Sequence, residues 1–263
     1  HPTLEVLDLH DNNLKSIVDT IDENPILEFL ALHSNDISGT IPTGIANLIK
    51  LRHLDLSTNK FRESIPNSIG TMTELTYLFL AENGFSASSI PRSWQNLENL
   101  KELSLKRTNL YSEIPDFLGS LTNLVLLDLD DNNLTGSIPQ SLSSLPALRF
   151  LLLNRNKLSG EIPVAFANST VFMFLVDKNT LTGDMSFMCD GDTRRDHVIA
   201  DCGGNDPDIA CEGECCQCCD KLSDEECNDF GLLANLDPMW DHGYKRKNYD
   251  FDMQKYIVYG NYN

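Results

Sequence analysis

Hydrophobic and polar residues recur along the chain in one pattern, L-x-x-L-x-L-x-x-N-x-L, with a period of 23 to 25 residues. Eight units begin at Leu4, Leu27, Leu51, Leu75, Leu100, Leu124, Leu148 and, with Val and Phe substitutions, Val171. The alternation in L-x-x-L-x-L predicts a short strand, and the constant period predicts a stack of similar units. Because each unit can bury its leucines only against a neighbour, we expect a solenoid.

The asparagine of each unit has a different role from the leucines. Its amide group carries donors and acceptors, so asparagines stacked along the solenoid can satisfy buried turn backbone in a continuous ladder. One unit has Thr108 at this position and is also the unit with the 25-residue spacing. Since threonine offers only a hydroxyl group, we expect a local adjustment of the ladder there.

A second motif lies in the other half of the repeat. Ile-Pro recurs in phase at Ile41-Pro42, Ile65-Pro66, Ile90-Pro91, Ile114-Pro115, Ile138-Pro139 and Ile162-Pro163. Because proline cannot continue a hydrogen-bonded ladder, the motif predicts an extended convex segment that leads into a short helical turn. The two motifs together resemble the plant-type leucine-rich repeat of cell-surface receptors and polygalacturonase inhibitors. The resemblance implies an α/β repeat fold: a right-handed solenoid with a parallel concave sheet and short convex 3₁₀ or extended segments.

The composition changes where the period ends. We divide the chain into a solenoid (1–188), a cysteine-rich C-terminal cap (189–227) and an aromatic-rich C-terminal arm (228–263). All eight cysteines belong to the cap: Cys189, Cys202, Cys211, Cys215, Cys216, Cys218, Cys219 and Cys227. An even number at this density is typical of a disulfide framework in an oxidising compartment, with 105 possible pairings. The alternative is zinc, because Cys215-x-x-Cys218 and Cys216-x-x-Cys219 have ligand spacing, but no second, separated pair completes a four-ligand site.

The C-terminal region carries a second resemblance. The run Ala200-Asp201-Cys202-Gly203-Gly204, the paired cysteines and Asn228-Asp229-Phe230 are similar to the C-terminal region of diatom leucine-rich repeat, receptor-like proteins. This resemblance implies a surface protein and names no ligand. The arm holds too many large apolar side chains to stay in water, so we expect it to pack on the last repeats, on the cap or on another subunit.

Charge and sequence context restrict the partners and the compartment. The net charge of −19 argues against nucleic acid as a partner, and no apolar stretch is long enough to span a membrane. Two sequons, at Asn133 and Asn168, agree with secretion and are candidate glycosylation sites. The chain enters its first repeat three residues after His1, so we expect a processed chain or a partner that covers this repeat. Together these features predict a secreted or cell-surface protein.

The candidate ligand-binding face is the concave sheet. Read down the stack, the two outward positions of each strand are rich in apolar and aromatic residues, which we expect to form exposed patches flanked by charge. The candidate contact residues are Phe29, Arg52, His53, Tyr77, Phe79, Arg107, Leu126, Phe150, Leu152 and Arg155. The alternative is that the apolar side chains pack on one another and the charges form cross-strand pairs.

The sequence contains none of the common catalytic or cofactor motifs, such as G-x-S-x-G, H-E-x-x-H or a phosphate-binding glycine loop. We therefore expect no catalytic residue, cofactor or metal, and interpret the chain as a recognition module for a protein, peptide or glycan. Two alternatives remain. The chain is a structural subunit of a surface assembly, docking through its first repeat and its arm, or an inhibitor of a secreted hydrolase.

Overall fold

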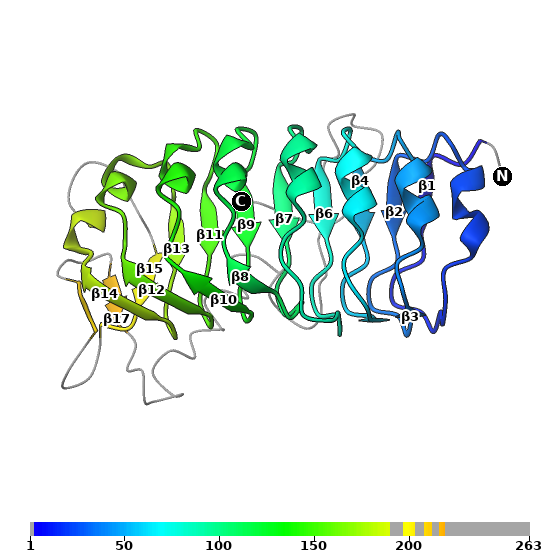
Figure 1. Ribbon diagram of the computed structural model, residues 1–263. Helices are drawn as coiled ribbons and strands as arrows, with labels where there is room; N and C mark the ends of the chain where they lie inside the picture. Colours follow the sequence, from blue (N-terminus) through cyan, green and yellow to red (C-terminus); the bar gives the residue numbers. More distant parts are fainter. Residues whose placement is uncertain (1–2, 190–196, 203–207, 212–215, 219–263) are drawn as a thin grey trace.

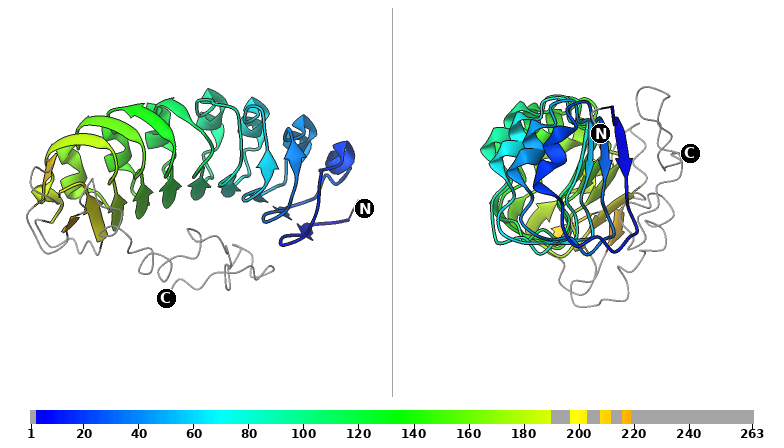
Figure 2. Two further views of the ribbon diagram at one scale, coloured as in Figure 1. Left: turned by 90° about the horizontal axis from the view of Figure 1, so that it is seen from below. Right: turned by 90° about the vertical axis from the view of Figure 1, so that its right-hand side faces the viewer.

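The computed structural model describes residues 3–189, 197–202, 208–211 and 216–218. These residues form one curved solenoid with a long parallel sheet along its inner side and short 3₁₀ turns along its outer side (Figures 1 and 2). The solenoid predicted from the leucine period is thereby confirmed. The C-terminal arm, 228–263, lies outside the described residues, so the predictions made for it remain predictions.

The inner sheet contains ten described strands, all parallel and in sequence order. They are β1 (Val6–Asp8), β2 (Phe29–Ala31), β4 (His53–Asp55), β6 (Tyr77–Phe79), β7 (Glu102–Ser104), β9 (Leu126–Asp128), β11 (Phe150–Leu152), β13 (Met173–Leu175), β15 (His197–Ala200) and β17 (Cys216–Cys218). The first eight come from the eight predicted repeats, and their register follows the repeat, so that Phe29 pairs with Val6 and with His53. The last two extend the same sheet into the cap.

The outer side of each repeat combines an extended segment with a 3₁₀ turn. The extended segments form a five-stranded sheet of β8 (Tyr111–Glu113), β10 (Asn133–Gly136), β12 (Lys157–Glu161), β14 (Thr180–Asp184) and β16 (Ile209–Ala210), and a pair, β3 (Ser38–Gly39) and β5 (Lys60–Phe61). The turns are η1 (Asp19–Glu23), η2 (Thr43–Asn47), η3 (Asn67–Thr71), η4 (Arg92–Asn96), η5 (Asp116–Ser120), η6 (Gln140–Ser144), η7 (Val164–Asn168) and η8 (Ser186–Met188). Turns η2 to η7 each begin directly after the proline of an Ile-Pro motif, as predicted.

The asparagines form the expected ladder. Asn83 donates to the carbonyl groups of Leu56 and Leu80, both at 3.0 Å, and its Oδ1 accepts the amide of Phe61 at 3.1 Å. The hydroxyl of Thr108 donates to the carbonyl of Leu105 at 2.6 Å and lies 3.5 Å from Oδ1 of Asn132 in the next repeat. The additional residue of the 25-residue spacing lies before Thr108, between Asn83 and Ile90, where Ser88 forms an isolated bridge with Leu110. The predicted local adjustment is therefore present.

The core lies between the two sides of each coil and runs the length of the solenoid. The repeat leucines are almost fully buried, and larger side chains fill the wider places, including Trp94 and the stacked rings of Phe61 and Phe85, whose centroids are 6.3 Å apart. Val198 of β15 joins this core, and β15 pairs with β13. The described part of 189–227 therefore continues the stack beyond β13.

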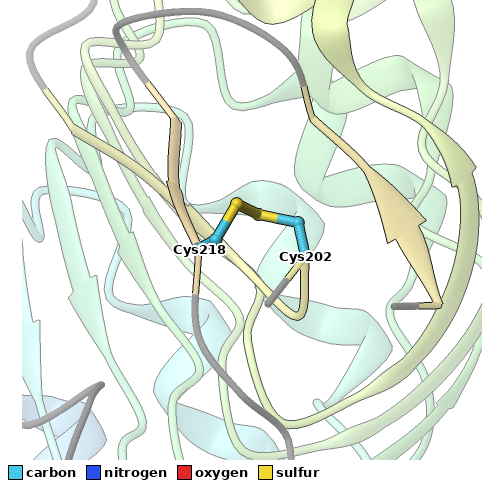
Figure 3. Close-up of a disulfide and its surroundings, with 2 residues drawn as sticks. All are labelled: Cys202 and Cys218. Carbon is cyan, nitrogen blue, oxygen red and sulfur yellow. A yellow bond between two sulfur atoms is a disulfide. The ribbon is translucent and has the colours of Figure 1, made fainter. Parts of the chain in front are cut away.

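Disulfides close the cap. Cys202, which follows β15, is bonded to Cys218 in β17, so the bridge ties together the last two strands of the inner sheet (Figure 3). Cys189 and Cys211 are also disulfide-bonded. A sulfur in a disulfide is not a thiolate, so Cys218 cannot complete a zinc site with Cys215. Cys215, Cys219 and Cys227 lie outside the described residues, and the side chain of Cys216 is not described.

Candidate ligand-binding face

The predicted contact residues come together on the inner sheet. Phe29, His53 and Tyr77 occupy the same position of β2, β4 and β6 and pair in register. Their rings follow one another, with centroids 4.3 Å apart between Phe29 and His53 and 5.7 Å apart between His53 and Tyr77. The centroid of the Phe79 ring lies 5.6 Å from that of the His53 ring. Leu126, Phe150 and Leu152 continue the same two columns in β9 and β11.

The exposure predicted for these side chains is wrong. Phe29 and Phe79 are 0 % exposed, and Tyr77, Leu126, Leu152 and His53 are also buried, whereas Phe150 is half-buried. They form a second hydrophobic cluster, separate from the core of the solenoid. The parallel register is one physical reason, because each side chain is flanked by its counterparts on both neighbouring strands. The alternative interpretation, packing along the sheet, therefore describes the apolar residues better.

The predicted charged residues divide into pairs between neighbouring repeats. Arg155 donates to Oδ2 of Asp130, and Nε of Arg107 lies 2.5 Å from Oδ2 of Asp131. Both pairs join consecutive coils, as expected for cross-strand pairing. Arg52 is half-buried at the edge of the aromatic column. Arg107 and Arg155 give the inner face a charged rim along the turns that follow the strands, whereas Arg52 directly precedes β4.

At the N-terminal end of the rim, a buried carboxylate lies against an imidazole ring. His33 Nδ1 lies 3.2 Å from Oδ2 of Asp55, and its ring stacks on that of His10 with centroids 4.7 Å apart. The Asp55 carboxylate also accepts the amide of Ser57 at 3.0 Å. Burial opposes both charges, but the mutual attraction is stronger, so the pKa of His33 is raised and that of Asp55 is held well below its usual range.

At the C-terminal end, carboxyl groups are buried with less compensation. Burial, together with the neighbouring Asp130, raises the pKa of Asp128 to about 6, although Lys106 opposes the change. Burial also raises the pKa of Asp177 to about 6, against the attraction of Arg155 and with repulsion from Asp201 and Asp130. Burial raises the pKa of Asp130 too, in spite of Arg155. In this part of the rim, burial therefore favours the protonated form of the carboxyl groups.

One functional candidate was missed in the sequence. The residues two places before the ladder asparagine face the rim and include Lys106, Asp130, Asn154 and Asp177, all of them buried. The same column-by-column comparison that gave Phe29 and Tyr77 would have found them. The outward columns of the strands end two residues before these positions and therefore do not contain them.

The two sequons lie on the surface. Asn168 ends η7 and is exposed, and Asn133 begins β10 with a half-buried side chain. Both are on the outer side of the solenoid, away from the inner sheet. Their glycosylation remains a prediction.

Comparison with known proteins identifies the class. A family model described as a leucine-rich repeat region matches residues 1–135, and a single leucine-rich repeat model matches residues 147–169. The chain therefore belongs to the leucine-rich repeat proteins. The similarity of the C-terminal region to diatom proteins falls outside these matches and remains a prediction. A search of the curated proteins found no match.

Solved structures place the chain near plant receptors. The Arabidopsis receptor kinase HAESA, in complex with the peptide hormone IDA and the co-receptor SERK1, is 40% identical with a TM-score of 0.69, over 70% of this chain and 31% of that chain. The ectodomain of GASSHO1/SCHENGEN3 from Arabidopsis thaliana, in complex with CASPARIAN STRIP INTEGRITY FACTOR 2, is 34% identical with a TM-score of 0.67, over 71% and 23%. The chain thus spans about a third or less of these receptors.

A third structure shows the fold in another setting. A plant ice-binding protein is 24% identical, with a TM-score of 0.64, over 83% of this chain and 77% of that chain. At this identity the likeness concerns the fold alone. Among the residues that the structure describes, no helix is long and apolar enough to cross a membrane.

Proposed function

We propose that this protein is a secreted or cell-surface recognition module that binds a peptide along the inner face of its solenoid and performs no chemistry. The observation that carries the proposal is the inner face itself, where ten parallel strands present a continuous, registered row of side chains with a charged rim. Both receptors described above were solved with a bound hormone or factor, and HAESA with a peptide hormone. This favours a peptide over a glycan.

The burial of the aromatic column specifies where a ligand makes its first contacts. Arg52 and Phe150 are half-buried and Arg107 is exposed, so these are the candidate residues that a ligand can reach directly. The buried residues, Phe29 and Tyr77 among them, would support this surface from beneath. We therefore expect a ligand to lie along the rim and to contact the apolar cluster at its half-buried edge.

A secreted or surface location has independent support. The cap contains disulfide-bonded cysteines, which persist in oxidising compartments. One sequon asparagine, Asn168, is exposed. Mass spectrometry of the native protein before and after reduction would test this part of the proposal, and eight free thiols would contradict it.

Selection from a phage-displayed library of random linear peptides tests the function. Selected peptides should lose at least about tenfold in affinity for Phe150→Ala and Arg52→Ala variants, because these residues lie on the inner face. Tyr111→Ala is the matched control, since Tyr111 is an exposed aromatic residue of β8, outside the inner sheet. Equal effects in all three variants, or no selected peptide at all, would contradict peptide binding on this face.

Two other functions would give different results. A stable high-mass complex in native size-exclusion chromatography that is lost on deletion of residues 228–263 would favour a structural subunit. Inhibition of a secreted hydrolase by the purified chain, lost in the inner-face variants, would favour an inhibitor. Neither has an observation of its own that ranks it above peptide recognition.

A further inference from the structure

Three consecutive repeats place acceptor side chains in one column of the rim. Asp130, Asn154 and Asp177 occupy the same position of the turns that follow β9, β11 and β13. Backbone hydrogen bonds join these turns: the amide of Asp131 donates to the carbonyl of Asn154 at 3.1 Å, and that of Arg155 to the carbonyl of Asp177 at 2.9 Å. We call these three residues the acceptor column.

Two oxygens of the acceptor column are buried without a hydrogen-bond donor. They are Oδ1 of Asp130 and Oδ1 of Asn154, in side chains that are 4 % and 5 % exposed. The other carboxyl oxygen of Asp130 is occupied by Arg155. A buried acceptor that has no donor costs about 1–3 kcal/mol, so native proteins rarely leave one unsatisfied without a water molecule or a ligand.

The charged groups around the acceptor column include more acids than bases, which also favours a cationic ligand. Four buried carboxyl groups, those of Asp128, Asp130, Asp177 and Asp201, face the buried Lys106 and the half-buried Arg155. Asp128 and Asp201 are satisfied, by Ser104 and by the amides of Lys178 and Asn179 respectively. Both cations contact Asp130, so within the acceptor column the deficit of positive charge falls on Asp177. The raised pKa of Asp177, caused mainly by burial, agrees with this deficit.

We propose that the acceptor column binds a cationic group of the ligand, a lysine ammonium or an arginine guanidinium. The inference rests on the proposed function and adds the chemistry that the ligand must carry. An ammonium group has three donors and no acceptor, which matches a row of three acceptor side chains. A peptide that runs along the rim would insert this side chain between the turns, at repeats six to eight.

An organic cation fits the column better than a metal ion. Within the part of the chain that the structure describes, no three carboxyl, imidazole or thiol groups converge closely enough to bind a metal. Neighbouring strands are about 4.8 Å apart, so the spacing of successive acceptors suits a group larger than a metal ion. Hydrogen bonds to a charged donor are also the stronger kind, about 1.5–3 kcal/mol each, and would offset the cost of the unsatisfied oxygens.

A small probe tests the site without a selected peptide. The full chain is titrated with Nα-acetyl-lysine methylamide, and amide NMR shifts are followed at residues 130, 154 and 177. The norleucine analogue, which has a similar aliphatic chain but no ammonium, is the control probe. We expect shifts with the lysine probe only and at least about tenfold weaker binding in Asp177→Asn. Equal effects of the two probes would show that the ammonium group contributes nothing to binding, and would overturn the proposal.

Two further variants separate the site from overall charge and from folding. Asp36→Asn makes the same change in net charge at a half-buried surface carboxyl of the N-terminal half, and it should leave binding unchanged. Asn154→Asp adds a charge to the column and should strengthen binding of the lysine probe. A loss in Asp177→Asn together with a gain in Asn154→Asp cannot come from partial unfolding. Equal loss in Asp36→Asn and Asp177→Asn would contradict the site.

The peptide library distinguishes failure of this site from failure of the proposed function. Selected peptides should contain lysine or arginine, and acetylation of that lysine should weaken them at least about tenfold. Peptides that depend on Phe150 but not on Asp177 would overturn the cation site and leave the function standing. If no peptide depends on the inner face, the function fails, and the lysine probe still decides whether the site exists.

The cation has two possible sources. A peptide from outside is one, and Lys245, Arg246 and Lys247 of the arm, outside the described residues, are the other. Replacing these three residues by glutamine in the full chain separates them. Stronger binding of the lysine probe in this variant would assign the site to the arm, and unchanged binding would assign it to an external ligand. Either result supports a cation at the acceptor column.

Discussion

The two ends of the rim show two ways to bury polar groups on the same scaffold. Near the N-terminus, Asp55 lies 3.2 Å from His33 and accepts a backbone amide, so its charge is compensated within the chain. Near the C-terminus, Asp130 and Asn154 each keep a buried oxygen without a donor, and Asp177 lies among other carboxyl groups. The scaffold is the same at both ends. The difference indicates that the first arrangement serves stability and the second is suited to binding.

Removal of Asp55 is expected to have the largest effect on stability. Asp55→Ala removes an acceptor from buried His33 and from the amide of Ser57. Removal of one partner of a buried ion pair leaves the other charge uncompensated and still shielded from water. The free energy of unfolding should therefore fall by about 3–5 kcal/mol. Urea denaturation followed by circular dichroism measures this change.

The control for Asp55 is a carboxyl of the same kind in a more exposed pair. Asp131→Ala removes the partner of Arg107 on the rim and should cost about 0–1 kcal/mol. A similar loss in both variants would show that burial of the His33–Asp55 pair contributes nothing particular, and the contrast between the two ends would disappear.

Asp177→Asn is expected to have the opposite sign. Burial raises the pKa of Asp177 from 3.8 to about 6, so its ionised form is disfavoured in the folded chain at neutral pH. Asparagine keeps the shape and removes the charge, so the free energy of unfolding at pH 7 should rise by an amount on the order of 1–3 kcal/mol. Asp201→Asn is the matched comparison. Asp201 accepts two backbone amides, so this variant should be destabilised, and stabilisation of both would contradict the distinction.

The fold was predictable because its signals are local and periodic. Leucine spacing determined the strands and their register, and Ile-Pro marked the start of six turns. The burial of Phe29 and Phe79 was not predictable in this way, because it depends on how side chains from several repeats pack together. The bond between Cys202 and Cys218 was one of many pairings that the sequence allowed. The acceptor column shares the repeat period, but the absence of a donor at Asn154 depends on side-chain geometry that no sequence pattern records.

The pH dependence of stability should separate the two ends, with a smaller change than either substitution above. Between about pH 4 and pH 6, folded Asp177 and Asp128 hold protons that the unfolded chain has released, so stability should fall as the pH rises. Asp177→Asn should remove about half of that slope. Above about pH 6.5 the raised pKa of His33 gives a further fall, because the folded chain then holds the extra proton. Below about pH 4 the lowered pKa of Asp55 makes stability fall as the pH falls.

These windows are read from urea denaturation at half-unit intervals between pH 3.5 and pH 8. In His33→Gln the fall above pH 6.5 should be absent, while the slope between pH 4 and pH 6 is retained. A slope between pH 4 and pH 6 that is unaffected by Asp177→Asn would remove the C-terminal carboxyl groups as its cause.

The smallest effect is expected at a third polar cluster, which has good partners but is open to solvent. Asp36 is paired with Lys15 and Lys60 from the neighbouring coils, and hydrogen bonds from these two lysines lower the pKa of Asp36 to about 2. The two lysine side chains are exposed and Asp36 is half-buried at the surface, so water and salt screen the charges. Asp36→Asn should therefore leave the melting midpoint unchanged within error. A loss comparable to that of Asp55→Ala would mean that the number of partners, and not burial, separates stabilising from binding carboxyl groups in this solenoid.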